Sequence, residues 1–166
     1  MDESLAGSLA TFLSNLSEET HRRFAPHAFD PTTIHELAAE KDPDCLRFVA
    51  LDHHTANVVA YMLFDRSSLK WEIRRAVSNG FNIDKDKSVR FAPVLANAWQ
   101  GSGLAGLMFG LVRDRLQLAG FDTILLWGGV QASNTKAIRF YERIGFVQAG
   151  RFWHEGVESW DMVLGW

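Results

Sequence analysis

The sequence feature that most limits the possible fold is a glycine-containing turn between an apolar segment and an amphipathic one. The turn, Gln100–Ala105, contains Gly101 and Gly103 and follows Val89–Ala96, a run apolar enough to form a buried strand. After the turn, apolar residues recur at intervals of three and four, which predicts a helix whose buried face carries Leu104, Leu107, Met108, Leu111 and Val112. Gly120 is the expected end of this helix. A strand, a glycine turn and a helix in this order present backbone N–H groups at the helix N-terminus, where they can bind an anion such as phosphate.

Two common nucleotide-binding motifs do not match this turn. No Lys-Ser or Lys-Thr pair follows the glycines, which argues against a P-loop for nucleoside triphosphates. The spacing is also not Gly-x-Gly-x-x-Gly followed by an acidic residue about 20 positions later. A purely structural turn and an unrelated nucleotide-binding α/β domain are the alternative interpretations.

Length and composition indicate a globular protein without a nucleic-acid or membrane partner. The 166 residues are expected to form one domain over residues 1–166. Hydrophobic residues make up 47% and charged residues 22% of the chain, and the formal net charge is -3, so there is no electrostatic reason to expect nucleic acid or an anionic membrane. The single cysteine, Cys45, excludes an intramolecular disulfide, and we find neither a secretory segment nor a long apolar run; we therefore expect a cytoplasmic protein.

Helices and strands alternate along the rest of the chain. Helices are predicted for Glu3–Phe24 with a fresh start near Ser17, after Asp30-Pro31, and from Asn134 to Ile144. Strands are predicted for Leu46–Leu51, Asn57–Phe64, Thr123–Trp127, Phe146–Trp153 and Ser159–Trp166. Thr123–Trp127 is apolar throughout, as expected for an internal strand parallel to the one before the turn. This order predicts an α/β protein with a mixed sheet.

The secondary structure of residues 65–90 follows less directly from the sequence than that of the other segments. Four apolar residues fit a short amphipathic helix, namely Leu69, Ile73, Ala76 and Val77. A connection this long in a compact domain is expected to be a functional flap or an element that contacts a partner.

Two segments together resemble one known family. Ala98–Ala105 resembles the acyl-CoA loop of the GCN5-related N-acetyltransferases (GNAT), written Gln/Arg-x-x-Gly-x-Gly/Ala. Some thirty residues later, Asn134–Phe146 is similar to the second motif of that family, Asn-x-x-Ala-x-x-x-Tyr-Glu-x-x-Gly-Phe. The resemblance is strong over Val89–Val147 and looser over Phe12–Phe64. It implies the GNAT fold, a mixed and mostly antiparallel sheet that splays between two parallel strands and is flanked by helices.

The chain departs from the family pattern in two ways. Family members usually begin with a strand before the first helix, and Met1-Asp2-Glu3 leaves no room for one, so we expect this strand to be missing. The exposed sheet edge could then be covered by another chain, which predicts a homodimer. No Asp or Glu occurs between Lys87 and Arg113, so the usual place for a general base is empty.

The resemblance implies direct transfer of an acetyl group from acetyl-CoA to a primary amine, without a metal. It implies coenzyme contacts at Val94, Leu95, Gln100, Gly101, Ser102, Gly103, Leu104, Ala105, Asn134 and Ala137. The pantetheine arm would lie between the strands ending near Ala96 and Trp127. Tyr141 would act as the general acid that protonates the departing thiolate. A tyrosine that only fills the core, and an asparagine that only caps its helix, are the alternative interpretations of Tyr141 and Asn134.

The proton acceptor for the amine is not determined by the sequence. Candidates are Glu72, Asp65, Asp84, His53, His54, Glu158 and Asp161, and for each of them taken singly an ordinary surface role is the favoured interpretation. The adjacent histidines lack metal-ligand spacing to other His or Cys residues, so no metal site is predicted. The acceptor is expected to be a small-molecule or peptide amine that enters near the early helices and residues 65–90. A non-catalytic acyl-CoA-binding or sensor module is the alternative function.

Overall fold

The structure is a computed structural model that describes residues 5–24, 26–39 and 42–166. These residues form two compact units. One unit contains the described residues up to Leu63 together with Ala92–Phe109, and the other contains Phe64–Phe91 together with Gly110–Trp166. The single domain over residues 1–166 stays a prediction.

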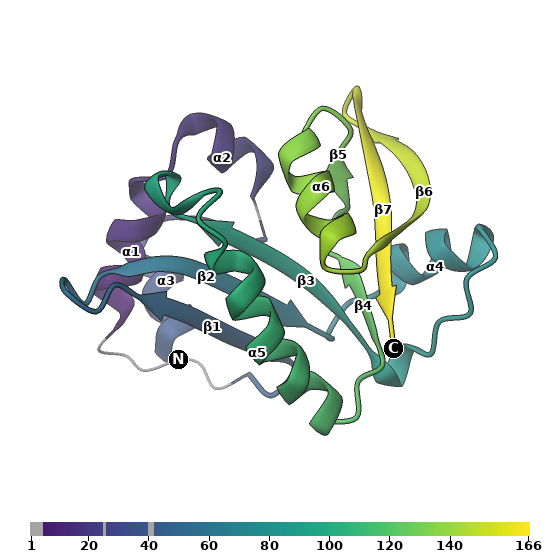
Figure 1. Cartoon of the computed structure of the whole chain (residues 1–166), viewed down its shortest axis with the longest axis horizontal. Helices are drawn as coiled ribbons and strands as arrows, with labels where there is room; N and C mark the ends of the chain where they lie inside the picture. Colours follow the sequence, from purple (N-terminus) through teal and green to yellow (C-terminus); the bar gives the residue numbers. More distant parts are fainter. Residues whose placement is uncertain (1–4, 25, 40–41) are drawn as a thin grey trace. The chain divides into compact units, whose positions relative to one another are not determined.

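The strands of the described residues form one mixed sheet (Figure 1). Their bounds are Cys45–Leu51 (β1), Val58–Asp65 (β2), Ser88–Leu95 (β3), Thr123–Leu126 (β4), Val130–Gln131 (β5), Val147–His154 (β6) and Val157–Gly165 (β7). Hydrogen bonds order them β1-β2-β3-β4-β7-β5, with β6 paired to β7. β3 and β4 are parallel, whereas β4, β5 and β6 each pair with β7 in the antiparallel direction. The predicted fold class is therefore confirmed, including the parallel pair at its centre.

The first unit begins with helices whose boundaries follow from their capping residues. These helices are α1 (Ala6–Ser14), α2 (Glu18–Arg23) and α3 (Pro31–Ala39). The helix predicted from residue 3 to residue 24 is interrupted at Ser17, which is extended and whose side chain accepts a hydrogen bond from the Thr20 N–H. Asp30 caps α3 in the same way by accepting from the Thr33 N–H, as its Asp-Pro sequence predicts.

β1 and β2 form the predicted hairpin, and β1 stands at one end of the strand order. A hydrogen bond from the Asp52 N–H to the Asn57 carbonyl closes the connection, which is too short to allow parallel pairing. From residue 5 onward no strand precedes α1 in the described residues, and residues 1–4 lie outside them, so the missing first strand stays a prediction. Coverage of the β1 edge by another chain stays a prediction.

The second unit carries helices on both faces of its strands. They include α4 (Lys70–Ser78) and α6 (Thr135–Arg143), which Figure 1 shows on opposite sides of β7. α4 packs against a buried cluster that includes Leu125 and Val163. Leu164, the next residue along β7, lies instead beside Gly145 at the end of α6. Because successive side chains of a strand point to opposite faces, α4 and α6 cover opposite faces of this part of the sheet.

Residues 65–90 form α4 and a short 3-10 turn, η2 (Lys85–Lys87), before β3 begins. The predicted helix is confirmed, but one of its four apolar residues does not face the core: Ala76 is fully buried, whereas Val77 is half exposed. Leu69, Ile73 and Ala76 belong to the core of the second unit. The segment is therefore a packed part of its unit, and its role as a functional flap or a partner-contacting element stays a prediction.

The helix after the glycine turn, α5, spans Leu104–Leu118. It ends at Gly120 as predicted, where φ is +90°. The predicted buried face is partly wrong, because Leu107 and Leu111 are 73% and 72% exposed. The buried side chains in this helix are those of Met108, Phe109, Val112 and Leu116. Within the described residues, no helix combines the length and the hydrophobicity that crossing a bilayer requires.

Candidate functional site

The turn predicted to bind an anion lies in the first unit, between the 3-10 turn η3 (Asn97–Trp99) and α5. Gly101 and Gly103 have φ angles of +80° and +89°, a conformation that side chains with a Cβ disfavour. A Cβ added at either glycine would meet no atom within 4 Å. Backbone conformation therefore requires both glycines, and the space beside them is open.

Hydrogen bonds hold this turn in place while leaving donors at its tip. Ser102 Oγ donates to the Trp99 carbonyl at 2.7 Å and accepts from the Leu104 N–H at 3.3 Å. In the part of the chain that the structure describes, the N–H groups of Gly101 and Gly103 make no backbone hydrogen bond. Two such donors beside the positive end of a 15-residue helix fit the predicted diphosphate of coenzyme A.

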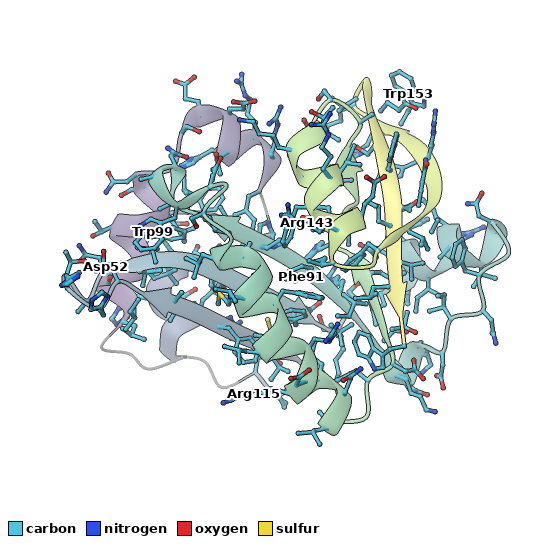
Figure 2. The ribbon with its side chains drawn as sticks, in the orientation of Figure 1. Asp52, Phe91, Trp99, Arg115, Arg143 and Trp153 are labelled. Carbon is cyan, nitrogen blue, oxygen red and sulfur yellow. The ribbon has the colours of Figure 1, made fainter. Side chains whose placement is uncertain are left out.

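Gln100, also predicted to contact the coenzyme, contributes to the turn itself. Its side-chain amide donates to the Leu95 carbonyl at 3.5 Å and to Asn97 Oδ1 at 3.4 Å. Figure 2 shows Trp99 at the same turn. The positions of Gln100 and Trp99 follow from the turn geometry, and their contact with a coenzyme stays a prediction.

β3 carries the backbone amides predicted to hold the thioester oxygen, those of Val94 and Leu95. Its parallel pairing with β4 ends with the hydrogen bond from the Trp127 N–H to the Phe91 carbonyl. Pro93 lacks an N–H, so β3 cannot donate the next bond of that parallel ladder. The end of the pairing therefore has a cause in the sequence. The role of the two amides stays a prediction.

The second motif forms α6 of the second unit. Asn134 is the N-cap residue of this helix and its Oδ1 accepts from the Ala137 N–H at 3.3 Å. Gly145, with φ of +103°, follows the helix end. Capping alone accounts for Asn134, and coenzyme contacts at Asn134 and Ala137 stay predictions.

Tyr141 lies on the buried face of α6, among aromatic side chains of the second unit. Its ring centroid is 5.6 Å from that of Phe146 and 6.5 Å from that of Phe91. Burial raises the pKa of the Tyr141 hydroxyl, which therefore stays protonated. Core packing is sufficient to explain the position of the Tyr141 ring. The protonated hydroxyl is in the state that a general acid requires.

Two ion pairs of the second unit, whose carboxylates are buried, were not predicted from the sequence. Arg90 Nε donates to Asp65 Oδ2 at 2.6 Å, and the Arg90 guanidinium carbon lies 3.6 Å from the ring centroid of Trp127. Arg75 makes two hydrogen bonds to the Asp161 carboxylate, at 2.7 and 2.8 Å. A charged residue inside an otherwise apolar strand, such as Arg90 in β3, was the signal available for finding these pairs.

Most of the side chains considered as proton acceptors have another role. Asp65 and Asp161 are the ion-paired residues just described. Asp84 accepts from a backbone N–H in the η2 turn, and Glu158 Oε1 lies 3.6 Å from Arg151 Nη1. His53 and His54 are exposed at the β1–β2 connection, with ring centroids 3.6 Å apart.

Glu72 differs from these candidates because it is buried and forms no ion pair among the described residues. It is buried on α4, with 6% of its surface exposed. Its Oε1 accepts a hydrogen bond from the Gly128 N–H at 3.3 Å, just after the end of β4. No cation pairs with it among the described residues.

Comparisons with known proteins agree with these elements. The sequence pattern of the "Acetyltransferase (GNAT) family" matches residues 10–146. The GNAT domain of PAT from S. lividans has a similar structure, with a TM-score of 0.75 and 16% identity over 100% of this chain and 88% of that chain. A mutant of the spermidine N-acetyltransferase SpeG from Vibrio cholerae gives a TM-score of 0.72 and 20% identity over 99% of this chain and 92% of that chain.

A third similar structure is that of AAC(6')-Ib in complex with paromomycin and acetyl-CoA. Its TM-score is 0.68, with 19% identity over 99% of this chain and 90% of that chain. At these identities the structural similarities establish the fold. No curated protein sequence matches the chain significantly.

Proposed function

Because the chain belongs to the GNAT family of acetyltransferases, we propose that it transfers an acetyl group from acetyl-CoA directly to the primary amine of an acceptor. One observation carries the proposal: both family motifs occupy the local structures that the reaction needs. Gly101 and Gly103 form a positive-φ turn at the N-terminus of α5. Asn134 caps the helix that buries a protonated Tyr141.

The backbone of the turn binds the diphosphate of the coenzyme in this proposal. The N–H groups of Gly101 and Gly103 donate to it, and the N-terminal end of α5 supplies a favourable dipole. Ser102 and Gln100 keep the turn rigid, while Leu104 and Ala105 form the first helical turn beneath it. An N–H of Val94 or Leu95 holds the thioester oxygen, and an oriented donor of this kind contributes about 3 kcal/mol in a dry site.

Two proton movements accompany the transfer. The thiolate that leaves as the C–S bond breaks takes a proton from the Tyr141 hydroxyl, and a thiol of pKa about 8.5 needs only modest assistance. The amine must lose a proton before it can attack, because a lysine-like amine has a pKa of about 10.4. Tyr141 therefore serves the leaving group, and a separate group must serve the amine.

Small polycationic amines are the first acceptors to test. The structurally similar proteins include a spermidine N-acetyltransferase and an enzyme bound to paromomycin with acetyl-CoA. We include a peptide with an unblocked N-terminus, since the sequence does not separate small amines from peptide amines. We place the reaction in the cytoplasm, in keeping with the chain's single cysteine.

The test is release of thiol from acetyl-CoA in the presence of spermidine, paromomycin or the peptide. The proposal predicts acceptor-dependent thiol release with at least one of these amines. Binding of acetyl-CoA without release in any reaction would contradict it.

A non-catalytic acyl-CoA-binding module is the second candidate. One observation favours it: β3, with the sequence SVRFAPVL, carries no carboxylate. A sensor would gain thermal stability from acetyl-CoA, by about 2.7 kcal/mol at a hundredfold excess over Kd, yet would acetylate nothing. Thermal shift and thiol release measured together separate the two functions.

A further inference from the structure

Glu72 is a buried carboxylate with one hydrogen bond in the described residues. It is one of the few buried acidic side chains of the second unit, and its Oε1 accepts from the Gly128 N–H. In the described residues, its second carboxylate oxygen accepts no hydrogen bond and forms no ion pair. A buried carboxylate with one uncommitted oxygen is able to accept a hydrogen bond or a proton from a ligand.

The other buried charges around α4 neutralise one another. Asp65 of β2 pairs with Arg90 of β3, and Arg75 of α4 pairs with Asp161 of β7. β4 contributes no ionisable side chain to this face, and the remaining charged residues of α4 and β6 are exposed: Lys70, Arg74, Arg151 and His154. Glu72 therefore has no cationic partner in this cluster.

Glu72 and Tyr141 belong to opposite faces of the same strands. Phe91, which Tyr141 contacts, is in register with Leu126 of β4. The α4 cluster instead contains Leu125, the neighbouring residue of β4, whose side chain points to the other face. Glu72 contacts Gly128, the residue after Trp127, whose N–H donates the last hydrogen bond between β4 and β3. The carboxylate therefore lies beside the point where the β3–β4 pairing ends.

We propose that Glu72 is the catalytic base that removes a proton from the ammonium group of the acceptor. The inference rests on the proposed function and supplies the carboxylate that β3 lacks. The Glu72 carboxylate takes one proton from R–NH3⁺, and the neutral amine then attacks the thioester carbon. The C–N bond forms as the C–S bond breaks. The thiolate receives the Tyr141 proton, the nitrogen's second proton restores Tyr141, and Glu72 releases its proton to solvent.

The size of the expected effect follows from the protonation of the acceptor. With a pKa of about 10.4, roughly one lysine-like amine in 2,500 is neutral at pH 7. Without a base, the enzyme would depend on that small fraction, and the fraction grows tenfold with each pH unit. A general base typically contributes about 10²- to 10⁴-fold to the rate.

The experiment compares the wild type with Glu72→Gln, whose side-chain oxygen can still accept from the Gly128 N–H but cannot take up a proton. Glu142→Gln is the matched control, since it makes the same change at an exposed position of α6. Thiol release is measured from pH 6 to 10 with the amine of the spermidine, paromomycin and peptide panel that the wild type uses fastest. The melting temperature and the calorimetric Kd for coenzyme A are measured for each variant.

We expect Glu72→Gln to lose at least a hundredfold in kcat/KM at pH 7 and to recover progressively toward pH 10. Its Kd for coenzyme A and the activity of Glu142→Gln should match the wild type. An equal loss at every pH would assign Glu72 to a structural role and overturn the inference, as would full activity. If Glu72→Gln does not fold, Glu72→Asp replaces it and must keep the wild-type pH profile at a lower rate. A wild type that acetylates no amine overturns the proposed function itself.

Discussion

Tyr141 combines a ring packed among Phe91 and Phe146 with a hydroxyl that keeps its proton. If it protonates the departing thiolate, removing only its hydroxyl should slow the reaction without disturbing the core. We therefore expect Tyr141→Phe to lower kcat by about 10²-fold or more. Steady-state thiol release measures this change.

Two further measurements separate catalysis from packing at Tyr141. The Kd for coenzyme A should stay within twofold of the wild type. Because burial raises the pKa of Tyr141, its proton should remain in place while pH rises to about 10, the pKa of an exposed tyrosine. The wild type should accordingly show no alkaline loss of kcat below that pH. An unchanged kcat in Tyr141→Phe would restrict Tyr141 to a core role.

A second prediction at the scale of residues concerns the contribution of the Asp65–Arg90 ion pair to the free energy of unfolding. Both side chains are largely buried, at 5% and 13% exposure. Asp65→Asn should lower the free energy of unfolding by about 3 kcal/mol, because it leaves a buried guanidinium without its counter-charge. Asp86→Asn, in the exposed pair with Lys85, should change it by less than about 1 kcal/mol. Urea denaturation measures both, and equal effects would contradict the account.

At the scale of elements, the glycine turn can be tested against a second glycine of the same conformation. Gly103 and Gly80 have φ angles of +89° and +86°, and neither has an atom near its added Cβ. Alanine at either position should cost about 1–2 kcal/mol of stability. Only Gly103→Ala should also weaken coenzyme A binding, by tenfold or more in calorimetry, since its Cβ would obstruct the anion. Equal affinities in the two variants would remove the turn from the binding site.

The sequence predicted the type of most elements, and its errors have identifiable causes. The prediction for α5 wrongly added Leu107 and Leu111 to the buried face, because they follow the same spacing as the buried Met108 and Val112. Periodicity defines a helix, but when two sides are apolar it does not say which one is buried. Strand β5 was missed because two residues are too short a segment to show any alternation.

The candidate site was predictable where local motifs define it and unpredictable where distant segments meet. The turn at Gly101 and the cap at Asn134 depend on neighbours in sequence, so their residue types revealed them. The contact between Glu72 and the Gly128 N–H joins positions 56 residues apart, and no local pattern encodes it. Pro93 could have been used, because a proline in a central strand marks the end of a hydrogen-bond ladder.

At the scale of the whole molecule, the order of elements was sufficient to predict the mixed sheet, and the two motifs were sufficient to predict the family. The family match over residues 10–146 excludes the alternative of an unrelated nucleotide-binding domain. The length of the segment between β2 and β3 predicted a flap or a partner-contacting element, because the residues it packs against, among them Leu125 and Val163, lie far along the chain. Length alone therefore did not distinguish a mobile connection from a packed helix.

The edge position of β1 supports a prediction about assembly. β1 ends the strand order, so in the described residues only one of its sides has a strand partner. An uncovered strand edge favours pairing with another chain, and we expect a homodimer of twice the 18.7 kDa chain mass. Light scattering measures this mass directly. A monomer at all concentrations tested would contradict the prediction.

The central claim is that this chain moves an acetyl group from a coenzyme thioester to an amine. Mass spectrometry of the amine after incubation with the protein and acetyl-CoA tests it most directly. The account predicts that spermidine, paromomycin or the peptide gains the mass of one acetyl group, with one equivalent of thiol released. If acetyl-CoA binds and every amine keeps its original mass, the chain does not catalyse the reaction proposed here.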